Sequence, residues 1–176
     1  MEPVSKVKIS KKRNNTLNKN IFTNNILSRK MYLNINEIGS NLKSNIEKKL
    51  QNEMEMKCNV EGYIKGGSIE VLTYSSGEVK GEYIVFNVNF ECLICKPVEG
   101  TIIYDCIVKN NTKAGIRAEL KGETPSPIVI FVSRDHNYSN EKISNLSEND
   151  IIAVKIIGIR YELNDTTICA IGELID

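Results

Sequence analysis

The chain has 176 residues, of which 26% are charged and 41% are hydrophobic, and its formal net charge is +1. This length suits one domain of ordinary size or two small ones, and the near-neutral total does not point to a strong nucleic-acid binder. No segment reaches the roughly 18 consecutive apolar residues that a membrane-spanning helix needs, so we expect no membrane partner.

The first 30 residues differ from the rest in charge, because they hold eight basic residues and a single acidic one, Glu2. They are rich in Asn and Lys and have little apolar surface to bury, which predicts a basic disordered arm over residues 1–30. Its "SKKR" sequence fits a nuclear address or a loose nucleic-acid contact as well as a solubilising tail. The basic residues are Lys6, Lys8, Lys11, Lys12, Arg13, Lys19, Arg29 and Lys30.

A short strand and then a helix are predicted after the arm. Residues 31–38 alternate weakly and predict a short strand. Leu42, Ile46 and Leu50 then recur every four residues, which is the spacing of one face of an α-helix. The sequence therefore predicts an amphipathic helix over residues 41–54.

Strands and turns make up the remainder of the first half. Lys65-Gly66-Gly67 separates two apolar runs and predicts a hairpin turn, because glycine adopts positive φ without strain. Every second residue from Ile84 to Ile94 is apolar, while Asn87, Asn89 and Glu91 lie on the other face, which is typical of a half-buried strand. Pro97 ends this strand, since proline is poorly tolerated inside a sheet.

Five further strands are predicted after Pro97, and five short strands in about 80 residues are typical of a small barrel of the OB type. We therefore predict an α+β module over residues 31–96, followed by an all-β barrel over residues 97–176, with mostly β-structure and one main helix. The predicted barrel strands are 99–109, 114–120, 127–133, 150–161 and 166–174.

The chain contains five cysteines and a single histidine, His136. Cys92 and Cys95 form a Cys-x-x-Cys, but residues three apart on a strand face opposite sides, so the two thiols cannot easily share a metal. We expect core thiols in an intracellular, reducing compartment, with no metal and no cofactor.

No enzyme signature is present in the sequence. Ser133, Asp135 and His136 lie together in the chain, but neighbouring side chains diverge and cannot form a nucleophile–base relay. Phosphate-binding glycine loops and zinc-protease motifs are also missing. We therefore expect neither catalytic residues nor a small-molecule substrate.

The second and third barrel strands carry the best candidate site. If Ile116 and its alternating apolar neighbours fill the barrel, Lys113 and Arg117 lie outside it, with Phe131 on the next strand. An exposed aromatic ring beside cations is what binders of single-stranded nucleic acid use. The alternative, that Phe131 packs against a barrel end and the cations only solvate the surface, is equally compatible with the pattern.

The order of these segments resembles the stalk subunit of multisubunit RNA polymerases, namely the seventh subunit of RNA polymerase II and its archaeal counterpart. The resemblance extends over residues 31–176. The abundance of Asn, Ile and Lys is similar to that of the versions carried by large DNA viruses. It is carried by "MYLNINEIGSNLKSNIEKKLQNEMEMKCNVEGYI", "FECLICKPVEGTII", "AGIRAEL", "SPIVIFVS" and "ICAIGEL".

The resemblance implies a non-catalytic subunit that docks by its N-terminal tip near the polymerase clamp and RNA exit channel. Its S1-type barrel would contact nascent single-stranded RNA, and a second stalk subunit is a further partner. Ile116 departs from the family, which has an aromatic residue there, and this favours weak, backbone-led binding. The implied docking residues are Tyr63, Lys65, Gly66, Gly67 and Ser68. The implied RNA-binding residues are Lys109, Lys113, Arg117, Phe131, Arg134 and His136.

Two other functions fit the sequence. A free-standing S1-type RNA-binding module in translation or RNA decay would need the barrel, but not an ordered module before it. A structural protein of a particle would use the barrel for packing alone. The nucleus, a cytoplasmic virus factory and a virion are all compatible locations.

Overall fold

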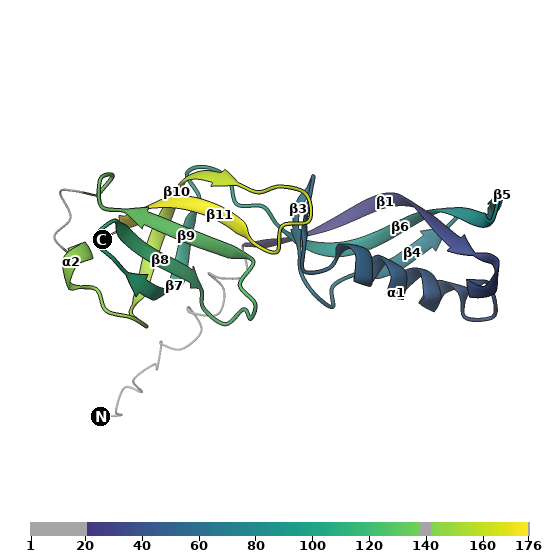
Figure 1. Cartoon of the computed structure of the whole chain (residues 1–176), viewed down its shortest axis with the longest axis horizontal. Coiled ribbons are helices and arrows are strands. Elements are labelled where there is room, and N and C mark those ends of the chain that lie inside the picture. Colours follow the sequence, from purple (N-terminus) through teal and green to yellow (C-terminus); the bar gives the residue numbers. More distant parts are fainter. Residues whose placement is uncertain (1–20, 138–141, 176) are drawn as a thin grey trace, which may run out of the picture.

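The computed structural model describes residues 21–137 and 142–175, which form two modules placed end to end (Figure 1). The tip module contains β1 to β6 with α1, and the barrel module contains β7 to β11 with α2. The predicted fold class, an α+β tip followed by an OB-type barrel, is confirmed.

The tip elements are β1 (Phe22–Asn34), the 3-10 helix η2 (Ile35–Glu37), α1 (Leu42–Met54), β2 (Cys58–Asn59), β3 (Gly62–Ile64), β4 (Glu70–Tyr74), β5 (Glu78–Lys80) and β6 (Tyr83–Cys95). The barrel elements are β7 (Ile102–Asn111), β8 (Gly115–Leu120), β9 (Ile128–Ser133), α2 (Lys142–Asn145), β10 (Ile151–Arg160) and β11 (Ile168–Ile175).

The tip is a sheet built around β6, with α1 packed on one face. β1 pairs with one side of β6, and β3, β4 and β5 pair in turn with the other side. The predicted apolar face of α1 is buried at Ile46 and Leu50, which pack with Phe86 and Phe90 of β6. Burial of this stripe, more than helix propensity, stabilises a helix of this length.

β1 corrects the predicted extent of the disordered arm. The strand begins at Phe22, so residues 22–30 are ordered β-structure, while residues 1–20 lie outside the described part of the chain. β1 pairs with β6 without a register shift, from Phe22 opposite Cys95 to Asn34 opposite Tyr83. Its pattern was missed because asparagine and charged residues hide the alternation, and because its partner lies some 60 residues further along the chain.

The Lys65-Gly66-Gly67 turn is not the predicted hairpin. β3 and β4 do not pair with each other, because both pair antiparallel with the same side of β6. The main-chain N–H of Lys65 donates to the carbonyl of Leu93 at 2.9 Å, and the Leu93 N–H donates to Ser68 Oγ at 3.2 Å. The turn therefore interrupts one long path beside β6 instead of reversing the chain.

The barrel closes in the strand order β10-β11-β9-β8-β7, with β7 paired to β10. The pairing of β9 with β11 is parallel, and the other pairings in the barrel are antiparallel. This is the topology of the five-stranded OB barrel. Neither helix in the described residues has the length and apolar character needed to cross a bilayer.

The hydrophobic cores cross the boundary predicted at residues 96 and 97. Cys58, Tyr63 and Cys95 belong to the tip sheet but pack within the barrel core. Cys92, three residues before Cys95, packs in the tip core instead. β6 therefore contributes to both cores, and the stretch that contains the two cysteines is the joint between the modules.

Candidate nucleic-acid interface

Three neighbouring strands place their exposed side chains in one row on the outside of the barrel. Arg117 of β8 lies opposite Phe131 of β9, and Phe131 lies beside Ile171 of β11. Their chain neighbours Ile116 and Ile130 point into the barrel and are fully buried. The predicted pairing of Arg117 with an outward Phe131 is therefore confirmed.

Phe131 keeps 39% of its surface exposed and lies against Gly115. A Cβ atom at Gly115 would come within 2.9 Å of Phe131 Cζ and 2.3 Å of the Val132 carbonyl oxygen. Only glycine fits there, because either contact is far closer than van der Waals distance. The glycine thus lets the ring lie close to β8, beside Arg117.

Ile171 is a member of this row that was not predicted from the sequence. It is 45% exposed and follows a local alternation like many others in the chain. Only the parallel register of β9 and β11, which are separated by more than 30 residues, brings it beside Phe131. The row therefore offers an apolar surface with one cation at its end.

Arg117 is only partly available to a phosphate. Its side chain is 57% exposed, and its Nη2 lies 3.1 Å from Glu119 Oε1 on the same strand. The neighbouring carboxylate offsets part of the positive charge. This favours the weak binding expected from the sequence.

Arg134 holds the end of the barrel together. Its guanidinium donates to the Thr112 carbonyl, to Asn111 Oδ1 and to Ser144 Oγ, each at 3.0 Å. Three of its five donors are thus used to connect β9 to the β7–β8 loop and to α2. The structure gives Arg134 a positioning role that the sequence did not indicate.

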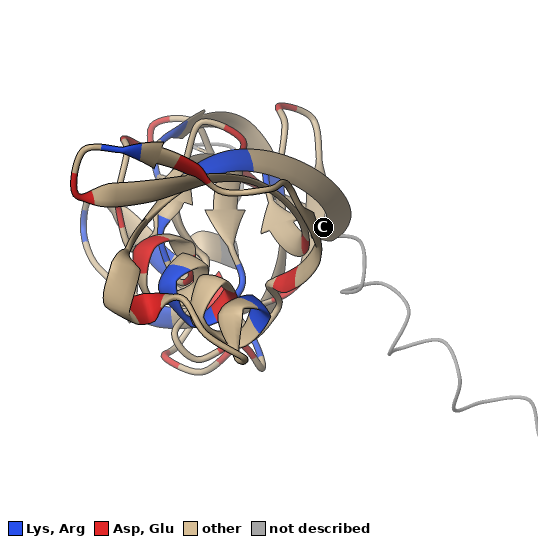
Figure 2. Cartoon of the chain, turned by 90° about the vertical axis from the view of Figure 1, so that its right-hand side faces the viewer, with Lys and Arg blue, Asp and Glu red and all other residues tan. Residues whose placement is uncertain are grey.

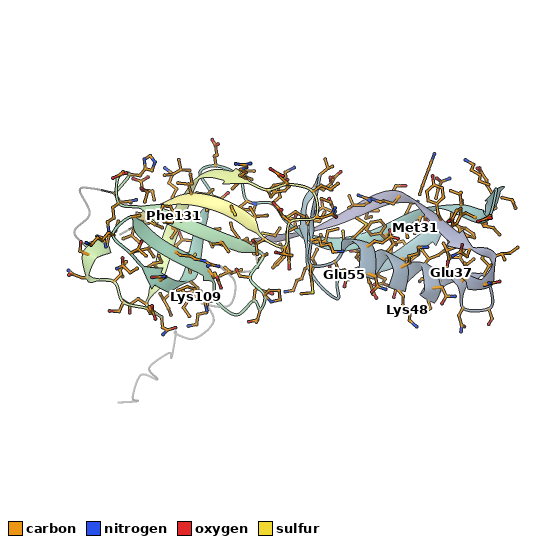
Figure 3. All side chains as sticks on the ribbon, in the orientation of Figure 1. Met31, Glu37, Lys48, Glu55, Lys109 and Phe131 are labelled. Carbon is orange, nitrogen blue, oxygen red and sulfur yellow. The ribbon has the colours of Figure 1, made fainter. Side chains whose placement is uncertain are left out.

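The other predicted RNA-binding residues, Lys109, Lys113 and His136, are exposed but do not lie together in one cluster. Lys109 lies at the bulge where β7 faces Arg117, and β8 separates it from Phe131 (Figure 3). Lys113 lines an open depression together with Arg134 and Leu146. His136 is exposed, two residues beyond Arg134. Within the described part of the chain, the side chains of Lys109, Lys113 and His136 have no hydrogen bond or ion pair.

The predicted docking residues lie at or beside the joint, where Gly66 and Gly67 are exposed, Lys65 and Ser68 are partly exposed and Tyr63 is buried. Tyr63 is only 3% exposed and packs in the barrel core, so its side chain offers almost no surface for docking. Lys65 Nζ lies 2.7 Å from Glu123 Oε1 of the barrel and 4.7 Å from the centre of the Phe22 ring. The main-chain N–H groups of Gly67 and Ser68 both donate to the Glu55 carboxylate.

The end of the tip opposite the barrel is a different surface. It contains β5 and the start of α1, and Figure 1 shows it at the right of the molecule. Seen from that end, lysine and arginine alternate with aspartate and glutamate, with no face of a single sign (Figure 2). Electrostatics alone therefore does not select a docking face there.

The four buried cysteines lie in environments that raise the thiol pKa and so suppress thiolate formation. Burial raises the pKa of Cys92 to about 11, and burial together with the neighbouring Cys58 raises the pKa of Cys95 to about 12. A thiol must lose its proton to bind a metal or to act as a nucleophile. No group of three potential metal ligands occurs among the described residues.

The fold and this surface define a class of protein: an α+β tip fused to an OB-type barrel whose outer face carries an aromatic residue and an arginine. No protein-family model matches the chain. It is similar to RNA polymerase II subunit 7 of Arabidopsis thaliana, with 26% identity over 172 residues that cover 89% of this chain and 93% of the plant protein. The corresponding subunit of Dictyostelium discoideum is 28% identical over 165 residues, covering 84% and 91%.

A viral relative is also similar. A protein of Acanthamoeba polyphaga mimivirus that carries the name of a DNA-directed RNA polymerase subunit is 30% identical over 104 residues, which is 52% of this chain. In this match the chain spans about half (49%) of the viral protein. Together these relatives confirm the resemblance to the RNA polymerase stalk subunit that the sequence indicated.

Proposed function

We propose that this protein is a non-catalytic subunit of a DNA-directed RNA polymerase. The observation that carries the proposal is the similarity to subunit 7 of RNA polymerase II, which covers both modules and not the barrel alone. A free-standing RNA-binding module would require similarity only in the barrel. The core shared across the joint supports the proposal, because it makes the tip and the barrel one unit.

The finer proposal is that the tip docks on the polymerase core near the clamp and the RNA exit channel, while the barrel contacts emerging single-stranded RNA. The row of Arg117, Phe131 and Ile171 would lie against the bases, and the exposed lysines Lys109 and Lys113 would attract the phosphates. We place the protein in an intracellular, reducing compartment, since Cys58, Cys92, Cys95 and Cys106 are buried free thiols.

Mild affinity purification of the tagged protein from its own cells tests the proposal. We expect the two largest polymerase subunits in amounts comparable to the tagged chain, together with any second stalk subunit. Recovery of ribosomes or nucleases without polymerase would favour the free-standing module in translation or RNA decay.

The RNA face is tested by charge reversal. The double variant Lys113→Glu/Arg117→Glu should weaken the binding of single-stranded RNA and flatten its dependence on salt by about 0.7 in log–log slope per lost phosphate contact. We expect the wild type to bind within the non-specific range of about 10⁻⁴ to 10⁻⁶ M. Fluorescence anisotropy at several salt concentrations measures both effects.

The matched control is Lys43→Glu/Lys48→Glu, which makes the same change of charge on exposed positions of α1 in the tip. It should leave RNA affinity almost unchanged. If both double variants lose affinity equally, the barrel face is not the binding site and only the total charge matters.

A further inference from the structure

β1 is the border strand of the tip sheet, and its outer side is open along much of its length (Figure 1). It pairs with β6 over all 13 residues and has no second strand beside it within the described residues. Border strands usually carry a protective feature such as a bulge, a proline or a covering loop. β1 has no bulge in its pairing with β6 and no proline.

The hydrogen bonds of its neighbours show which main-chain groups of β1 point outward. In an antiparallel pair, alternate residues direct both their N–H and their C=O away from the partner strand. The Tyr32 carbonyl accepts from Lys49 Nζ at 2.6 Å, and the Asn34 N–H donates to Glu37 Oε2 at 2.7 Å. Both bonds come from outside the sheet, so the even-numbered residues of β1 face away from β6.

The hydrogen bonds on the other side of β6 also show that the even-numbered residues of β1 face outward. Asn87 and Leu93 use their main-chain groups toward Ser75 and Lys65, on the side of β6 away from β1. Their partners on β1 are Lys30 and Asn24. These two residues therefore receive no main-chain bond from β6, and their N–H and C=O groups point outward.

Four residues in this stretch direct main-chain groups outward that find no partner among the described residues. No hydrogen bond to the main chain of Asn24, Ile26, Ser28 or Lys30 is present within the described part of the chain. Alternate positions on one strand are about 7 Å apart, so the open stretch is about 20 Å long. That length matches an added strand of six or seven residues.

The side chains along this stretch select the partner's chemistry. Ile26 is 68% exposed, and Arg29 and Lys30 are exposed without an ion pair among the described residues. Residues 1–20, which lead directly into β1, hold six basic residues and one acidic residue. A second copy of this chain would bring like charges together, whereas an acidic strand would meet opposite charges.

We propose that β1 between Asn24 and Lys30 binds an extended, acidic segment of another protein as an additional strand of the tip sheet. Main-chain hydrogen bonds to the four outward-facing residues provide the affinity. Lys30, on the same face of the strand as Ile26, selects glutamate or aspartate in the partner, and Arg29 adds positive charge on the opposite face. The inference rests on the tip sheet alone and is independent of the RNA face.

The test is a titration of the ¹⁵N-labelled full-length chain with a short acetylated peptide of alternating valine and glutamate. The amide signals of Asn24, Ile26, Ser28 and Lys30 should shift and become protected from hydrogen exchange. The peptide with lysine in place of glutamate should bind about tenfold more weakly. Shifts confined to other residues, equal affinity for both peptides or no binding at about 1 mM would overturn the proposal.

Two variants sharpen the test. Ser28→Pro removes one outward N–H but no bond to β6, so binding should fall while the α1 and β6 signals stay in place. Arg29→Glu/Lys30→Glu leaves the backbone unchanged and should reverse the preference between the two peptides; an unchanged preference contradicts the charge selection. Because no polymerase is present, failure here is separate from failure of the proposed function.

Discussion

Two cysteines on one strand show how closely a residue's surroundings control its chemistry. Cys92 and Cys95 are three residues apart on β6 and therefore face opposite sides of the sheet, one in the tip core and one in the barrel core. This alternation could be predicted from the sequence, and the structure places the two thiols in different cores. The pKa of each thiol, which depends on packing by distant segments, could not.

The raised pKa of Cys95 predicts a loss of stability in alkali. Its pKa is about 12 in the folded protein against an ordinary value of 9.0, so the unfolded chain releases this proton first. The contribution is complete below pH 9 and is lost as the pH rises toward 12, at up to about 1.4 kcal/mol per pH unit. Urea unfolding between pH 8 and 11 should show a shallower decline for Cys95→Ala than for the wild type.

Cys169→Ala is the matched control, because this thiol is exposed on β11. Its decline with pH should equal that of the wild type. If Cys95→Ala also follows the wild type, Cys95 ionises normally in the folded protein and its burial is incomplete.

The contacts of single residues in the site also divide into those that local sequence predicts and those that depend on distant segments. The adjacency of Arg117 and Phe131 followed from alternation in two consecutive strands, which is local information. The bonds of Arg134 to Ser144 and of Lys65 to Glu123 join residues that are distant in the chain, and no spacing in the sequence marks them. The same holds for the burial of Tyr63.

Among the elements, α1 and the barrel strands were predicted to within three residues at each end. Their patterns are long and regular, and each barrel strand is bounded by turn residues. β1 and the segment from β3 to β4 were misjudged because β6 determines their conformation. A strand whose alternation is weak becomes ordered when a strongly alternating partner supplies the hydrogen bonds.

One carboxylate bonds three consecutive main-chain donors of the segment between β3 and β4 to the end of α1. Glu55, directly after α1, accepts hydrogen bonds from the main-chain N–H groups of Gly67, Ser68 and Ile69 at 2.8 to 3.1 Å. Without it these three donors would lose their protein partner. We expect Glu55→Ala to lower the free energy of unfolding by about 2 kcal/mol and to speed amide exchange in residues 67–69.

The control for this change is Glu53→Ala, two residues earlier on the exposed side of α1. It should alter the free energy of unfolding by less than about 0.5 kcal/mol. Equal effects of the two variants in urea titrations would mean that helix propensity, not the bonds to the segment, accounts for the loss.

At the scale of the whole molecule, the joint is made by several independent contacts. The N–H of Cys58 donates to the Asp165 carbonyl at 2.7 Å, and the N–H of Asn164 donates back to the Cys58 carbonyl at 2.8 Å. Lys65 of the tip also forms an ion pair with Glu123 of the barrel and lies over the ring of Phe22 in β1. Two barrel loops, which contain Glu123 and Asn164–Asp165, thus hold the tip sheet to the barrel.

Removing the charge of Lys65 tests the joint. Lys65→Met loses an ion pair whose side chains are about one-third exposed and a cation–π contact with Phe22, and it should lower the free energy of unfolding by about 1 kcal/mol. Lys80→Met is the control, because its pair with Glu78 is far more exposed and should contribute almost nothing. A Lys65→Met variant as stable as the wild type would show that the apolar core alone holds the joint.

The passage of β6 from one core into the other has a mechanical consequence. A flexible connection between two modules needs a segment that can bend without disturbing packing. Here a bend near Cys92 and Cys95 would open the tip core, the barrel core or both. Force applied to the barrel is therefore transmitted to the far end of the tip as a rotation of the whole body, in the way that a lever transmits torque and a tether does not.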